Sequence, residues 1–257
     1  MRIRRHRRKY HSGVDLPSFP EGTDIVIDAT NPAYVTDDGT NVSQILDISG
    51  NDNNVTASGT ERPTLGGTPV NGLQSLVFNG SSNVMRSDFD LPQVGSDDLY
   101  VLLALYAQVG TSNRVFAACS QDTAAGVTRG GPWKWTQRSS IDLRIPVTDA
   151  FNAADTDRWD GAYTSPNPYV WGMTIERLTS TSYRQEIYSN STSVGDSVAR
   201  SGDGKGPLNL TDRLTIGGDK TALFQRMDFC EIRVASGPNV RDNFIAQLEG
   251  MLTKYNV

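Results

Sequence analysis

Residues 227–256 read MDFCEIRVASGPNVRDNFIAQLEGMLTKYN and join a strand pattern to a helix pattern. Cys230, Ile232 and Val234 occupy every second position, which is typical of a β-strand with two different faces. After Pro238 and Asn239, which favour a helix start, apolar residues recur at helical spacing. We therefore predict a strand followed by a helix over residues 239–255 that packs one apolar stripe on a sheet. The stripe consists of Val240, Phe244, Ile245, Leu248, Met251, Leu252 and Tyr255.

Short apolar runs alternate with turn sequences along the rest of the chain. Segments such as DDGTN, SGNDNN and SGDGKGP supply the Gly, Asn, Asp and Pro that turns need. Many short strands and one helix favour a single all-β domain, a two-sheet antiparallel sandwich over residues 21–257, preceded by an arm and linker over residues 1–20. The predicted strands cover residues 23–28, 42–48, 75–80, 99–109, 114–120, 141–145, 169–178, 182–189, 213–218 and 227–235.

Three stretches of the body carry a family resemblance. VSQILDISGNDNNVTASGTERPTLG (42–66) contains D-x-S-G-N-x-x-N followed by R-P-T, NGLQSLVFNGSSNVMRS (71–87) contains N-G-x-x-x-L-x-F-x-G, and residues 230–257 form the closing strand, turn and helix. Together they resemble the concanavalin A-like lectin/glucanase superfamily in its laminin-G-like form, as found in phage virion surface proteins. The resemblance implies a jelly-roll sandwich. Family members range from sugar-binding modules to hydrolases and structural spacers, so the fold does not select a function.

The N-terminus carries a strong positive charge. Residues 1–20 contain six Lys/Arg and one Asp, a charge of +5, which leaves −10 for residues 21–257 of a chain with −5 overall. The basic start is followed by HSGVDLPSFPEG and not by an apolar run, so we predict no export signal. We predict that the arm anchors the protein to an acidic surface through its six cations. These are Arg2, Arg4, Arg5, Arg7, Arg8 and Lys9.

The distribution of histidine and cysteine limits the catalytic options. His6 and His11 both lie in the arm, so the body has no histidine for a Ser-His-Asp or Cys-His system, nor for a zinc site. Cys119 and Cys230 lie in strand patterns, and we expect two reduced core thiols. We predict no catalytic residues and a protein that is not an enzyme.

A carboxylate pair is the remaining route to hydrolysis. Retaining glycosidases need two carboxyl groups about 5–5.5 Å apart. Glu176 and Glu186 could face each other across a hairpin, but each has an arginine nearby, Arg177 or Arg184. A solvated, charged strand face is the interpretation that this pattern favours.

The loop DISGNDNN offers a candidate cation site. Asp47, Asn51 and Asp52 supply oxygen donors of the kind that calcium prefers. The same residue types also form turns by hydrogen bonding to their own backbone. We expect no other cofactor.

The tryptophans gather in one part of the chain. All four lie between residues 133 and 171, and we expect Trp171 in the core. The others, with two tyrosines, lie in loop-like sequence, where flat apolar rings can stack on a sugar. The alternatives are packing of a long loop onto the sandwich and contact with a neighbouring protein. The candidate glycan contacts are Trp133, Trp135, Trp159, Tyr163 and Tyr169.

These observations favour a non-enzymatic structural protein of a phage virion, either a capsid decoration or cement subunit or a tail-associated one. The arm would bind other virion proteins of the capsid or tail shell, and the sandwich would face outward and contact host-surface glycans. We expect a homo-oligomer within an assembly on the virion surface, put together in the host cytoplasm, with neither nucleic acid nor a membrane as partner. The alternative is a carbohydrate-binding lectin or a polysaccharide-degrading enzyme, and a third option is a coat protein whose Arg-rich arm packages nucleic acid.

Overall fold

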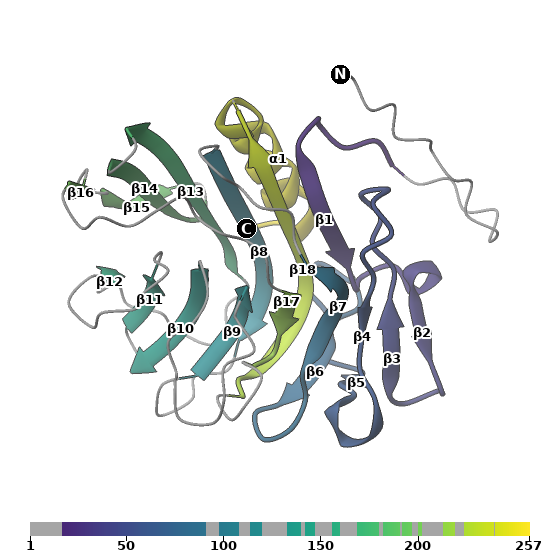
Figure 1. Cartoon of the computed structure of the whole chain (residues 1–257). Helices are drawn as coiled ribbons and strands as arrows, with labels where there is room; N and C mark the ends of the chain where they lie inside the picture. Colours follow the sequence, from purple (N-terminus) through teal and green to yellow (C-terminus); the bar gives the residue numbers. More distant parts are fainter. Residues whose placement is uncertain are drawn as a thin grey trace.

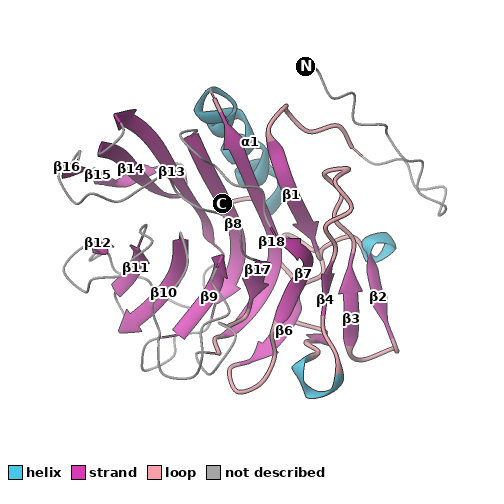
Figure 2. Cartoon of the chain, viewed as in Figure 1, coloured by secondary structure: helices cyan, strands magenta, loops and turns pink. Residues whose placement is uncertain are grey.

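The structure is a computed structural model that describes residues 17–90, 98–107, 114–119, 133–139, 142–146, 156–159, 169–179, 182–190, 192–196, 200–201, 213–218, 224–238 and 240–257. In these residues the chain forms two nine-stranded sheets whose strand pairs are all antiparallel, and one α-helix, α1 (Val240–Tyr255). Figures 1 and 2 show the two sheets as separate layers. The predicted all-β sandwich with a C-terminal helix is therefore confirmed.

The first sheet, sheet A, carries the helix. Its central strand β18 (Arg226–Gly237) pairs with β8 (Asp98–Ala107) along one side and with β1 (Thr23–Asp28) and β6 (Leu76–Asn79) along the other. Strand β13 (Tyr169–Thr179) follows β8. The remaining members are β5 (Thr64–Leu65), β14 (Ser182–Ser189), β15 (Thr192–Asp196) and β16 (Arg200–Ser201).

The second sheet, sheet B, has the order β12-β11-β10-β9-β17-β7-β4-β3-β2. One end consists of β12 (Thr156–Trp159), β11 (Asp142–Pro146), β10 (Trp133–Ser139) and β9 (Arg114–Cys119). The other strands are β17 (Arg213–Ile216), β7 (Met85–Asp90), β4 (Val55–Thr56), β3 (Val42–Ile45) and β2 (Val35–Asp37). Two short 3-10 turns, Pro32–Tyr34 and Gly59–Glu61, connect strands at this end of the chain.

Both sheets contribute fully buried apolar side chains. Phe78 of β6 and Phe229 of β18 pack edge to face with ring centroids 6.1 Å apart. Trp171 is only 1% exposed, so its predicted place in the core is confirmed. Other buried side chains include Ile25, Ile27, Leu76 and Ile232 from sheet A and Ile45, Val55, Met85, Leu214 and Ile216 from sheet B.

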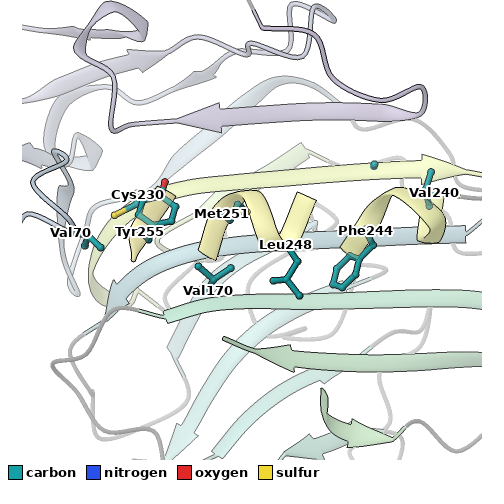
Figure 3. Close-up of a cluster of buried hydrophobic side chains, with 9 residues drawn as sticks. Val70, Val170, Cys230, Val240, Phe244, Leu248, Met251 and Tyr255 are labelled. Carbon is teal, nitrogen blue, oxygen red and sulfur yellow. The ribbon is translucent and has the colours of Figure 1, made fainter. Parts of the chain in front are cut away.

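Helix α1 lies along sheet A and forms a second apolar cluster with it (Figure 3). Phe244, Leu248 and Met251 of the helix are buried in this cluster together with Val170 of β13 and Cys230 of β18. The predicted stripe is thus confirmed for most of its members. Ile245 is the exception: it is 48% exposed, because it lies at the margin of the stripe. No helix among the described residues is long and apolar enough to cross a membrane.

The predicted alternation of β18 is wrong at Cys230, where the strand contains a β-bulge. The register against β8 shifts between Phe229 and Glu231, and Cys230 packs with the helix cluster. Regular alternation would have placed Cys230 on the same face as Ile232. The extra residue of a bulge reverses the facing of the residues on one side of it, which no pattern of period two can reveal.

Candidate functional site

Four of the five aromatic residues predicted to contact a glycan lie in strands. Trp133 and Trp135 belong to β10, Trp159 belongs to β12, and Tyr169 begins β13. Tyr163 lies outside the described residues. The predicted loop placement is therefore wrong for the three tryptophans, whereas Tyr169 begins the strand that was predicted over residues 169–178. Polar neighbours suggested loops, whereas large aromatic side chains also fit the pleated surface of a strand.

The strand register relates these tryptophans to the core. Trp133 and Trp135 are two residues apart on β10 and are paired with Cys119 and Ala117 of β9. Trp135 is paired with Ala117 of β9, and Ala117 is paired with Ile216 of β17. Ala117 and Ile216 are both fully buried. In the strand order of sheet B, Trp159 on β12 lies two strands further from β17 than Trp135 on β10. Glycan contact by these residues stays a prediction.

Glu176 and Glu186 lie on the same face of the β13–β14 hairpin but not opposite each other. Glu176 is opposite Arg184, and Glu186 is opposite Thr174. The Arg184 guanidinium lies 3.2 Å from Glu176 Oε2, and the Tyr188 hydroxyl donates to Glu186 Oε2 at 2.8 Å. Each carboxylate has its own partner in the hairpin. This arrangement is that of a charged strand face.

Asp47 holds the start of β1 in place. Its Oδ1 accepts from the backbone N–H groups of Val26 at 3.0 Å and Ser49 at 2.9 Å. Its Oδ2 accepts from the Ser49 hydroxyl at 2.8 Å and from the Asn53 N–H at 3.0 Å. The side chain is fully buried, and burial raises the pKa of Asp47 although these hydrogen bonds favour its charged form. The carboxyl group thus connects the loop 47–53 to β1.

The other two residues of the predicted cation site take different positions. Asn51 donates its side-chain amide to the carbonyl oxygens of Thr23 and Asp24, both at 2.9 Å. Asp52 is partly exposed with a φ of 61°, a backbone conformation that Asp tolerates better than most residues. The described residues contain no group of three or more His, Cys, Asp or Glu side chains arranged for a metal. The loop geometry favours the turn interpretation, and calcium binding stays a prediction.

Two asparagines in the motif of residues 71–87 also form hydrogen bonds with backbone groups. Asn79 Oδ1 accepts from the backbone N–H groups of Ser81, Ser82 and Asn83 at 2.8–3.2 Å. Asn83 in turn accepts from the Asn79 N–H at 2.8 Å and donates to the Arg62 carbonyl at 2.8 Å. These amides close the β6–β7 turn and attach it to the segment before β5.

The six cations of the arm lie outside the described residues, which begin at residue 17. The root of the arm, defined here as residues 17–22, is attached to the sandwich. Phe19 packs against the buried cluster of Val26, Tyr34 and Ile48, and Leu46 lies beside it. The arm therefore leaves from a defined place on the body.

A buried ionic cluster joins the C-terminal helix to sheet A, and the sequence analysis did not identify it. Glu231 of β18 is 1% exposed. Its Oε1 accepts from Arg233 Nε at 2.6 Å, and its Oε2 accepts from Lys254 Nζ at 2.7 Å and from the Tyr255 hydroxyl at 2.8 Å. Lys254 also donates to Asp28 of β1 at 2.7 Å. A glutamate between apolar residues of a strand was the available signal, but two of its partners, Lys254 and Tyr255, lie 23 and 24 residues further along the chain.

The charges in this cluster determine its pKa values. Burial alone would disfavour the Glu231 carboxylate, but Arg233 and Lys254 hold its pKa below the ordinary value. Burial works against the Lys254 ammonium as well, yet Glu231 and Asp28 raise the pKa of Lys254. Burial and the neighbouring Glu231 raise the pKa of Tyr255. The ion pairs are therefore formed at neutral pH, and they attach α1 to β1 and β18.

Sequence comparisons identify no relative. No model of a protein family matches the chain, and no curated protein matches it.

Solved structures with a similar fold do exist. An arabinofuranosidase complexed with arabinofuranosyl-α-1,2-xylobiose superposes with a TM-score of 0.63 at 13% identity, covering 84% of this chain and 52% of that one. The binding domain of Paraclostridial Mosquitocidal Protein 1 gives 0.55 at 10% identity, covering 91% and 52%. A Trypanosoma rangeli sialidase gives 0.55 at 12% identity, covering 92% and 36%.

At these identities the likeness concerns the fold alone. The chain spans about half of the length of the first two structures and about a third of the sialidase. The β-sandwich of this protein is therefore one that glycosidases, a sialidase and a toxin binding domain share.

Proposed function

We propose that this protein is a non-enzymatic structural subunit whose basic arm binds an acidic surface of a larger particle while the sandwich faces outward. In the most specific form of the proposal, the particle is a phage virion and the protein a capsid decoration, cement or tail-associated subunit. The concentration of positive charge at the N-terminus, +5 in residues 1–20 against −10 in residues 21–257, is the observation that carries the proposal. Phe19, ten residues after the last of the six cations, packs against the cluster of Val26, Tyr34 and Ile48, so the arm leaves the body at a defined place.

The charge distribution supports an acidic protein surface as the partner. The arm at +5 is attracted to negative charge, whereas the body at −10 is repelled by it. A nucleic acid is negatively charged along its whole length and would repel the acidic body wherever it bound. A small acidic patch on a protein, which only the arm reaches, fits this charge distribution better. Because screening shortens such attraction to about 8 Å at physiological salt, we expect binding to weaken as salt rises.

The interactions of the acidic side chains support a role without catalysis. Asp47 and Glu231 are buried and bonded to structural partners. Glu176 and Glu186 each have a partner within their hairpin. Through these contacts the four carboxyl groups support the strands and the helix.

Replacing the six arm cations by glutamine tests the proposal. Particles purified from the producing host are analysed by quantitative mass spectrometry for the full-length protein and for the variant. We expect incorporation to fall at least about tenfold, since the attraction depends on arm charge. A control with Arg213→Gln and Arg226→Gln, both exposed on the body, should be incorporated normally. Undiminished incorporation of the arm variant would overturn the proposal.

Glycan binding is a second candidate, favoured by the gathering of Trp133, Trp135 and Trp159 on β10 and β12. The similar solved structures include an arabinofuranosidase in complex with an arabinofuranosyl xylobiose and a sialidase. A glycan array probed with the full chain and with Trp133→Ala and Trp159→Ala tests it. Phe89→Ala is the matched control, because Phe89 is an exposed aromatic residue on β7, away from these strands. Signals lost only in the tryptophan variants would support the candidate, and an array without signals would overturn it.

A further inference from the structure

One arginine connects the root of the arm to the centre of the molecule. The Arg233 guanidinium carbon lies 5.5 Å from the centroid of the Phe19 ring, within the range of a cation–π contact. The same guanidinium donates to Glu231 at 2.6 Å and to the side-chain oxygen of Gln247 in α1. Arg233 therefore contacts the arm root, the central strand β18 and the helix at once.

The turn after Phe19 packs against the same corner of the molecule. Pro20 O accepts from both the N–H and the hydroxyl of Thr23, at 3.2 and 2.8 Å. Gly22 has a φ of +89°, and a Cβ there would lie 2.9 Å from Ser236 O and 3.0 Å from Val240 Cγ1. The Ser236 N–H donates to Gly22 O at 2.9 Å. The turn thus rests directly on the end of β18 and on the first residue of α1.

We propose that Phe19, held by Arg233, is a positioning residue for the arm. It fixes where the arm leaves the sandwich, at the corner formed by β1, β18 and α1. If Phe19 were released, the first residue fixed to the sandwich would be Gly22, and the arm would gain three residues of free chain, a reach of about 10 Å. The inference rests on the proposed function only in that the arm has a partner to reach. The contact itself belongs to the isolated chain.

The contact can be tested in solution with the full chain. A nitroxide label is placed at Ser18→Cys in a Cys119→Ser background. Cys230 is buried and burial raises its pKa, so it does not compete for the label. We expect a slow spectrum for the parent protein and a fast one for Phe19→Ala. The Thr23 amide should also exchange with solvent about tenfold faster in Phe19→Ala, because its bond to Pro20 loses support. The Asn53 amide, bonded to Asp47, should not change.

Three variants separate positioning from general stability. Phe19→Tyr keeps the ring and should retain the slow spectrum. Arg233→Lys keeps the positive charge beside Glu231 but loses the guanidinium plane, and it should give a fast spectrum at Ser18 in a chain that still folds. Phe89→Ala removes an aromatic side chain that is 63% exposed and should leave the label slow.

These experiments test whether Phe19 holds the root of the arm, and they do not require the arm's partner. A label at Ser18 that moves equally in the parent and in Phe19→Ala overturns the inference, as does a Phe89→Ala variant with the same effect as Phe19→Ala. Either result would leave the anchoring proposal standing, because particle incorporation depends on the arm cations. Conversely, normal incorporation of the glutamine-substituted arm would overturn anchoring and leave the Phe19 contact intact.

Discussion

Asp47 and Glu231 are two buried carboxyl groups beside strand β1, and they differ in the hydrogen-bond donors that surround them. Asp47 accepts hydrogen bonds from backbone N–H groups and from a hydroxyl. Glu231 is bonded to two cations and a hydroxyl. Burial raises the pKa of Asp47, whereas Arg233 and Lys254 hold the pKa of Glu231 below its ordinary value despite burial.

The difference shows what each carboxyl group is suited to support. Neutral donors fix a loop to a nearby strand with little dependence on distant elements. The Lys254 ammonium of α1 compensates the buried charge of the Glu231 carboxylate. Removing either partner would leave a buried ion without its counter-charge. The Asp47 loop is therefore a local support, while the Glu231 cluster couples the helix, β1 and β18.

The largest expected effect follows from removing the charge of Glu231. In Glu231→Gln, Arg233 keeps its charge without its buried carboxylate, and Lys254 retains only Asp28. Breaking a buried ion pair by removing one partner costs about 3–5 kcal/mol. We expect the free energy of unfolding, measured by urea denaturation, to fall by that amount.

Glu249→Gln is the matched control for this prediction, since Glu249 is an exposed glutamate of α1. It should change the free energy of unfolding by less than about 0.5 kcal/mol. Equal stability of Glu231→Gln and the parent protein would show that the cluster does not hold the helix.

Asp47→Asn should have the next largest effect. An amide cannot accept four hydrogen bonds, so its NH₂ group would face backbone donors such as Val26 N–H. Leaving a buried donor unsatisfied costs about 1–3 kcal/mol. We expect thermal denaturation to show this loss equally with calcium and with a chelator. Asp52→Asn in the same loop should be nearly neutral, and a loss that appears only with calcium would instead support the cation site.

The two carboxyl groups should give opposite pH dependences. The pKa of Glu231 is lowered on folding, so its contribution to stability is present above its ordinary value of 4.5 and is lost as pH falls through the folded pKa. The pKa of Asp47 is raised, so its contribution is present below 3.8 and is lost as pH rises through the folded pKa.

Denaturation curves between about pH 3 and pH 7 test these signs. The stability difference between the parent protein and Glu231→Gln should grow with pH. The difference between the parent protein and Asp47→Asn should shrink with pH. Parallel curves for both variants would contradict the assignment of these pKa directions.

Much of the fold could be predicted because the signals are local. The strands over 23–28 and 182–189 match to the residue, and all ten predicted strands have a counterpart. Alternation and turn residues report on neighbours in sequence, which is what a strand or helix boundary depends on. The shorter strands, such as β4 and β5 with two residues each, are too brief to give a pattern.

The candidate site could not be predicted in the same way, because its contacts cross long distances in sequence. Asp47 accepts from Val26, 21 residues earlier, and Lys254 donates to Asp28, 226 residues earlier. The sequence motif around Asp47 correctly indicated a special loop, but the same oxygens fit a turn or a cation until the position of β1 is known. The apolar–polar alternation of Trp133, Lys134 and Trp135 in β10 covers only three residues, which is too short to indicate a strand.

The smallest expected effect concerns Glu176→Gln. The pair of Glu176 and Arg184 is partly exposed, with 29% and 43% of the side chains accessible. Such pairs contribute about 0–1 kcal/mol because water screens them and both side chains lose freedom. We expect urea denaturation of Glu176→Gln to stay within that range, and Glu186→Gln, which affects the bond to Tyr188, serves as a comparison. An activity assay with the same two variants tests the hydrolase alternative. Reducing-sugar assays on polysaccharide should show no release of sugar by either variant or by the parent protein. Release by the parent that is lost in Glu176→Gln would favour the hydrolase alternative, since a catalytic acid matters far more to rate than to stability.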